Sequence, residues 1–140
     1  MGSVCCFLEL ATGVGFSAFS SATMDYDQGA TVGFDSVVSN VGGFYNADTG
    51  IFTCPTDGLY SFSVSAESDF DYYATLDIIR NGNVLLSMHA VYYDHDQSSI
   101  TAITECLVFD SVYIQCGEDN SQVKGGRRSS FSGVLITPYA

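Results

Sequence analysis

Residues 58–66 alternate strictly between two kinds of side chain. Large or apolar residues occupy every second position from Tyr60 to Ala66, and the residues between them are serine. This period of two is typical of a β-strand with one face in a core and one face toward solvent. Pro55 and Gly58, with Thr56 and Asp57 between them, are typical of a turn. The sequence therefore predicts a half-buried strand that follows a tight corner.

Aromatic residues, an asparagine and a glycine recur at fixed spacings around this strand. The positions are Phe34, Asn40, Tyr45, Phe52, Gly58, Tyr60, Phe62 and Val64. This ladder resembles the signature of the C1q globular-head domain, and it departs from that pattern only at Val64, where the family has Phe or Tyr. The segment 130–136 resembles the closing strand of the same family. The resemblance covers Gly13 to Tyr139 and implies a trimeric jelly roll of the kind shared with the tumour necrosis factor superfamily.

The composition favours an all-β domain. The 140 residues suffice for one domain, Trp is absent, Pro occurs twice, and apolar residues at helical spacing do not extend beyond about ten residues. We expect a ten-stranded jelly-roll sandwich of two five-stranded antiparallel sheets over residues 13–140, after an N-terminal segment 1–12. Nine of these strands can be placed in the sequence, at residues 14–20, 31–38, 51–54, 59–66, 74–80, 83–91, 100–109, 112–116 and 131–137. Asn81-Gly82 predicts a tight hairpin, and 40–50 a loop that holds Tyr45.

The apolar runs are too short and too interrupted for a membrane-spanning helix, so we expect a soluble protein. Residues 4–8 are apolar, but no basic residues precede them and Glu9 follows them. This segment is therefore a poor match to a signal peptide. Either a leader precedes this chain and has been removed, or the protein leaves the cell by another route. The resemblance implies a secreted, extracellular protein.

Most aromatic residues are predicted to lie in the core. Inward strand positions require large apolar side chains, and this applies to Phe16, Phe34, Phe52, Tyr60, Phe62 and Phe131. Other aromatics lie in acidic loops, where exposed rings are commoner at binding surfaces. The ligand-binding candidates of this kind are Tyr72, Tyr73, Tyr92 and Tyr93, beside Phe70, together with Asp94 and Asp96.

Strand phase places Cys54, Cys106 and Cys116 on inward faces. They are either buried thiols that behave as small hydrophobes or, in an oxidising compartment, members of a bridge such as Cys106–Cys116. Cys5 and Cys6 are adjacent and bridge each other only with strain, so they are free or joined between chains.

The chain carries 16 acidic and four basic residues, a net charge of −12. This balance argues against nucleic acid, whose phosphates require Lys and Arg. Acidic residues cluster in predicted loops, either as a solvated surface or as oxygen ligands for a hard cation. By the resemblance, the acidic loop near the trimer apex holds calcium in several relatives. The corresponding residues here are Glu118, Asp119 and Asn120.

Three of the four basic residues lie within five positions of one another, at Lys124, Arg127 and Arg128, with two glycines between them. Such a loop either binds phosphate or carboxylate groups, in three copies per trimer, or is a mobile loop whose charge does little. Only two histidines occur, and no nucleophile motif accompanies them, so we expect no enzyme activity.

The resemblance implies a soluble, homotrimeric innate-immune protein that binds microbial glycans or lipopolysaccharide. The alternative is a secreted cytokine-like or cerebellin-like ligand for a cell-surface protein receptor.

Overall fold

The computed structural model describes residues 13–68, 72–90 and 97–140. Twelve strands and no helix occur in these ranges. The strands are β1 (Gly15–Phe19), β2 (Met24–Tyr26), β3 (Ser36–Val41), β4 (Tyr45–Asn46), β5 (Ile51–Thr53), β6 (Gly58–Glu67), β7 (Ala74–Arg80), β8 (Asn83–Ala90), β9 (Gln97–Cys106), β10 (Ser111–Cys116), β11 (Ser121–Val123) and β12 (Ser130–Pro138).

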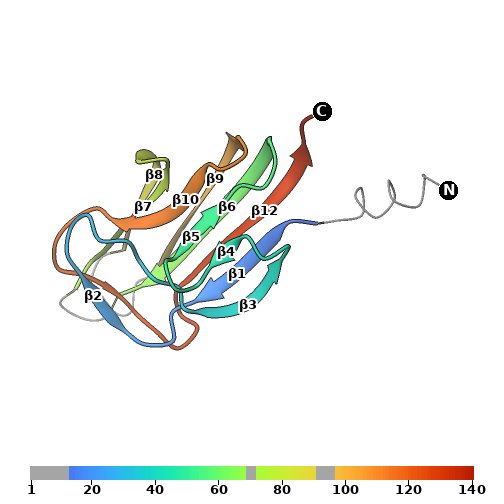
Figure 1. The fold of residues 1–140 in the computed structure, drawn as a ribbon. Helices are drawn as coiled ribbons and strands as arrows, with labels where there is room; N and C mark the ends of the chain where they lie inside the picture. Colours follow the sequence, from blue (N-terminus) through green and yellow to red (C-terminus); the bar gives the residue numbers. More distant parts are fainter. Residues whose placement is uncertain (1–12, 69–71, 91–96) are drawn as a thin grey trace.

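Ten of these strands form two antiparallel sheets that pack face to face (Figure 1). The first sheet has the order β3-β1-β12-β6-β9, and the second sheet has the order β4-β5-β10-β7-β8. The predicted sandwich of two five-stranded sheets is therefore confirmed. A third, two-stranded sheet of β2 and β11 was not predicted, because three residues are too few to show alternation.

The core lies between the two large sheets and is rich in aromatic rings. The six predicted core aromatics are all buried, each with at most 3% of its surface exposed. Phe16 is central, since its ring stacks on Tyr45 at 4.6 Å between centroids and meets Phe131 edge-on at 4.9 Å. Gly133 completes this packing, because a Cβ atom there would lie 2.6 Å from the rings of both Phe16 and Phe62.

Two predicted strands have the wrong bounds. The strand predicted at 31–38 is β3, which begins only at Ser36, because the preceding residues run along β10: the Val32 amide donates to the Ile114 carbonyl at 2.8 Å. The strand predicted at 100–109 ends at Cys106, because the Asp110 carboxylate accepts a bond from the Leu107 amide at 2.9 Å and closes a turn. Phe109 lies in that turn at φ 72°.

Two local predictions are confirmed. Asn81 and Gly82 have φ values of 50° and 83°, the positive pair that a type I′ hairpin turn requires.

Cys54, Cys106 and Cys116 are buried, and all three are free thiols, so the Cys106–Cys116 bridge is absent. Tyr45, predicted to lie in a loop, belongs to the two-residue strand β4.

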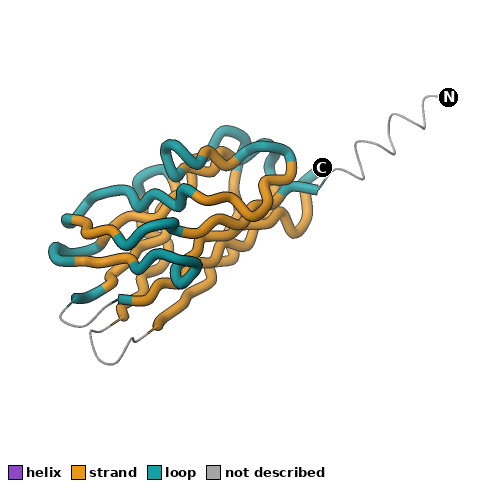
Figure 2. Tube along the Cα trace, turned by 90° about the horizontal axis from the view of Figure 1, so that it is seen from below, coloured by secondary structure: helices purple, strands orange, loops and turns teal. Residues whose placement is uncertain are grey.

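The loops between β1 and β2, β10 and β11, and β11 and β12 meet at one end of the sandwich, opposite the end where β12 finishes and β1 begins (Figures 1 and 2). We call this the loop end, formed by residues 20–23, 117–120 and 124–129. The candidate site residues that the structure describes lie at or beside it.

Candidate ligand-binding site

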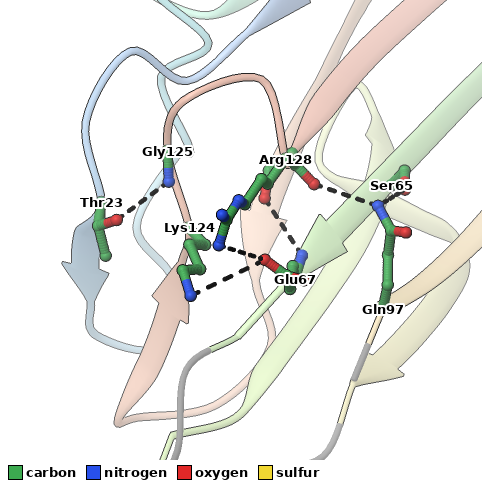
Figure 3. Close-up of polar contacts among 8 residues, drawn as sticks. Thr23, Ser65, Glu67, Gln97, Lys124, Gly125 and Arg128 are labelled. Atoms are coloured by element: carbon green, nitrogen blue, oxygen red, sulfur yellow. Dashed lines mark hydrogen bonds and ion pairs between the residues drawn. The ribbon is translucent and has the colours of Figure 1, made fainter. Parts of the chain in front are cut away.

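The three clustered basic residues lie on the basic loop, residues 124–128, which connects β11 to β12. Backbone contacts fix its path: the Lys124 amide donates to the Glu67 carbonyl at 3.0 Å, and the Gly126 amide donates to the Ser20 carbonyl at 3.0 Å. The Gly125 amide donates to Thr23 Oγ1 at 3.1 Å (Figure 3). A Cβ at Gly125 would lie 2.3 Å from the backbone carbon of Ala22, so only glycine fits there. The loop is thus held against the β1–β2 connection.

One carboxylate partners two cations of the basic loop. Glu67 Oε2, at the end of β6, lies 3.4 Å from Arg128 Nη1 and 4.0 Å from Lys124 Nζ (Figure 3). The side chains of Glu67 and Lys124 are each only 15% exposed, whereas that of Arg128 is 54% exposed. Glu67 thus binds both cations from the protein side, and Arg128 presents its guanidinium group to solvent.

Arg127 extends the positive surface and is oriented by an aromatic ring. Its guanidinium group lies 5.0 Å from the centroid of the Phe19 ring, which is a cation–π contact. Its backbone has φ 72°, which follows from the tight path after Gly126. The carbonyl of Arg128 accepts a bond from Gln97 Nε2 at 3.2 Å, so β9 also holds the loop (Figure 3).

Glu118 of the predicted calcium loop belongs to a polar cluster with two strand residues. The Thr75 hydroxyl donates to Glu118 Oε1 at 2.5 Å and lies 2.5 Å from Nδ1 of His89. The same ring nitrogen of His89 lies 3.4 Å from Glu118 Oε1. Thr75 and His89 are cross-strand partners in β7 and β8. Both the hydroxyl and the carboxylate approach the same ring nitrogen, so His89 does not bridge them as in a hydrolase triad.

The other residues of that loop turn elsewhere. Asp119 Oδ1 accepts a bond from the Gln28 amide at 2.8 Å, and Asn120 occupies a turn position with φ 60°. In the residues that the structure describes, no three His, Cys, Asp or Glu side chains converge in a way that could hold a metal ion. The loop as folded does not form a calcium cage, and calcium binding by Glu118, Asp119 and Asn120 stays a prediction.

Tyr72 and Tyr73 are half-buried rather than fully exposed. The Tyr73 ring stacks on His89 at 5.5 Å, and its carbonyl accepts a bond from the Gln122 amide at 2.7 Å. The structure therefore brings Tyr73 and Glu118 together through His89, a residue that the sequence did not single out. Its only sequence signal was its position opposite Thr75 in the predicted hairpin. The candidates Tyr92, Tyr93, Asp94 and Asp96, with Phe70, lie outside the described residues.

Comparison with known proteins identifies the family. The family profile described as "C1q domain" matches residues 15–136. The chain belongs to the C1q domain family. The resemblance carried by the aromatic ladder is thus confirmed, and members of this family are non-enzymatic recognition or signalling proteins, as expected here.

Curated relatives of this C1q domain include complement C1q tumor necrosis factor-related protein 3 of Homo sapiens, 30% identical over 84% of this chain and 49% of the relative. A complement C1q subcomponent of Mus musculus is 32% identical over 88% of this chain and 50% of the relative. The chain therefore spans about half the length of the curated relatives it matches.

Solved structures agree on the fold. The globular domain of zebrafish complement 1qA superimposes with a TM-score of 0.75 at 23% identity, covering 90% of this chain and 99% of that domain. Murine APRIL superimposes with a TM-score of 0.68 at 11% identity, covering 89% of this chain and 99% of the other. The predicted jelly roll of the C1q and tumour necrosis factor type is confirmed. No helix that could cross a membrane occurs in the ranges the structure describes.

Proposed function

We propose that this C1q domain is an extracellular, homotrimeric recognition protein that binds anionic groups of microbial surfaces, such as the phosphates and carboxylates of lipopolysaccharide and acidic glycans. The observation that carries the proposal is the basic loop. Three of the four basic residues in a chain of net charge −12 lie there, and the two arginines face solvent at the loop end.

The chemistry of the loop suits such ligands. Arginine binds phosphate and carboxylate through two parallel hydrogen bonds, and these charge-assisted bonds are stronger than neutral ones. Glu67 holds Arg128 from one side, so the rest of the guanidinium edge is available to a ligand. One such site is weak, but three copies on one trimer that engage a repetitive surface raise the apparent affinity by avidity.

The outer face of the first sheet supports the trimer. Val41, Val134 and Ile103 are 53%, 50% and 66% exposed, and cross-strand pairing through Gly15 and Ser61 places them in one row across that sheet. Ile136 of β12, which is 49% exposed, extends the apolar surface. A second copy of the chain is the occupant that we propose for this face.

The test compares binding of the parent protein and an Arg127→Ser, Arg128→Ser double variant to lipopolysaccharide vesicles. The variant keeps Lys124 as the partner of Glu67, so that no partly buried carboxylate is left without a cation. The matched control is Asn83→Asp with Ser87→Asp, which makes the same change of net charge on β8, away from the loop end.

We expect the arginine variant to bind about tenfold more weakly at low ionic strength and to lose most of its salt dependence. The control should bind like the parent. Equal binding by the arginine variant and the parent would place the recognition surface elsewhere.

A further inference from the structure

Cys54 and Cys106 meet at the end of the sandwich opposite the loop end. Cys54 follows β5 of the second sheet, and Cys106 is the last residue of β9 in the first sheet. The turn 107–110 begins directly after Cys106 and binds the backbone of Cys54 through two hydrogen bonds. The Cys54 amide donates to the Asp110 carbonyl, and the Phe109 amide donates to the Cys54 carbonyl, both at 2.8 Å. The backbone therefore brings the two cysteines together.

Their side chains lie close together in the core. Both residues are completely buried in one cluster between the sheets, and the interaction between the two thiols is the largest influence on the pKa of each. The guanidinium group of Arg80 lies at the end of β9 beside Cys106, since it donates to Thr104 Oγ1 at 2.7 Å and to the carbonyl of Glu105. A cross-link requires that the Cβ atoms of the two cysteines face each other, and the shared burial and the backbone bonds between Cys54 and the turn 107–110 place the pair for it.

We propose that Cys54 and Cys106 form a disulfide bond in the mature protein, one that ties the two sheets together at this end. The extracellular location belongs to the proposed function, but the linkage rests on the proximity of the two thiols and can be tested without any ligand. The bond would close a loop of about fifty residues, long enough for a large effect on the unfolded chain.

The bond forms by thiol–disulfide exchange while the turn 107–110 is still open and both thiols are accessible. The thiolate of one of the two cysteines attacks one sulfur of glutathione disulfide, forms a mixed disulfide and releases one glutathione thiolate.

The other cysteine then loses its proton to solvent and attacks the protein sulfur of the mixed disulfide. The second glutathione thiolate leaves as the Cys54–Cys106 bond forms. The two protein thiols are oxidised to one disulfide, and one glutathione disulfide is reduced to two molecules of glutathione.

Cys116 provides an internal control. It is equally buried, but burial raises its pKa to about 12, and no second cysteine is among the groups that influence this pKa. A non-specific oxidation would treat the buried cysteines alike, whereas the proposal singles out one pair.

The experiment refolds the full chain in a buffer of reduced and oxidised glutathione, blocks free thiols with an alkylating reagent under denaturing conditions, and maps the products by mass spectrometry after chymotrypsin digestion. Phe52 and Tyr60 flank Cys54, and Phe109 and Tyr113 separate Cys106 from Cys116, so each cysteine falls on its own peptide. Melting temperatures of the oxidised and the reduced parent are then compared.

We expect a peptide pair joined through Cys54 and Cys106, an alkylated Cys116, and a melting temperature about 10 °C higher for the oxidised protein than for the reduced one. Cys54→Ala and Cys106→Ala should each abolish that difference, and Cys116→Ala should retain it. Alkylation of Cys54 and Cys106 to the same extent as Cys116, or linkage of either to a different cysteine, would overturn the proposal. The mapping uses the parent protein, so it decides the matter even if a variant does not fold.

Discussion

Asn40 and Tyr45 exchange two hydrogen bonds across the turn that contains Gly42 and Gly43. Asn40 Nδ2 donates to the Tyr45 carbonyl at 2.7 Å, and the Tyr45 amide donates to Asn40 Oδ1 at 3.2 Å. The Tyr45 hydroxyl in turn donates to the Phe34 carbonyl at 2.7 Å. Three positions of the aromatic ladder are therefore one connected hydrogen-bonded unit at the edge of the core.

We expect Asn40→Ala to lower the free energy of unfolding by about 1–3 kcal/mol, because it leaves the amide and the carbonyl of Tyr45 without their partner. Asn83→Ala is the matched control, since Asn83 is exposed at the start of β8, and it should change stability by less than about 0.5 kcal/mol. Urea unfolding measures both. An equal effect of the two substitutions would show that the Asn40–Tyr45 pair does not brace the turn.

Phe62→Ala should lower the free energy of unfolding by about 3–5 kcal/mol, as large-to-small changes in packed cores do. The Phe62 ring is fully buried and lies 5.5 Å from that of Phe52. Phe109→Ala is the aromatic control: Phe109 is 80% exposed and should change stability little. If denaturant curves for these two variants coincided, Phe62 would not belong to the packed core.

The protein should be a trimer at micromolar concentration, and Val134→Asp should dissociate it. The substitution places a charge in the exposed apolar row of the first sheet, where the partner chain is proposed to pack, and an unpaired buried charge disfavours association. Ser87→Asp, on the second sheet, should leave the trimer intact. Light scattering coupled to size-exclusion chromatography reads the mass. A single-chain mass for the parent would remove both the trimer and the avidity argument.

Millimolar calcium should raise the melting temperature by a few degrees, as ligation of the native state does when the ion exceeds its dissociation constant about tenfold. The expected ligands are Glu118 and Asp119, so the double variant Glu118→Ala, Asp119→Ala should lose the shift. Magnesium, which demands tighter octahedral geometry, is the control ion. Identical melting curves in calcium and in chelator would eliminate this site.

The alternation in β6 determined which of its residues face the core, since successive side chains of a strand point to opposite faces whatever the strand packs against. The Asn81-Gly82 turn was equally local, because two positive φ values depend on those two residues alone. The aromatic ladder added the family and hence the jelly roll of two five-stranded sheets. These features could all be predicted, and the structure confirms them.

The site depended on contacts that no local pattern encodes. No pattern in the sequence marks Glu67 as a partner of basic residues, yet the fold places its carboxylate beside Lys124 and Arg128. In the sequence His89 looks like an ordinary strand residue. Only the folded loop that carries Glu118 brings a carboxylate close to its ring. Cys54 and Cys106 each had a predictable inward phase, but their proximity required two sheets to meet. Side-chain period is fixed by backbone geometry within one strand, whereas the partner of a side chain is fixed by the packing of segments distant in sequence, and only the tertiary structure decided that.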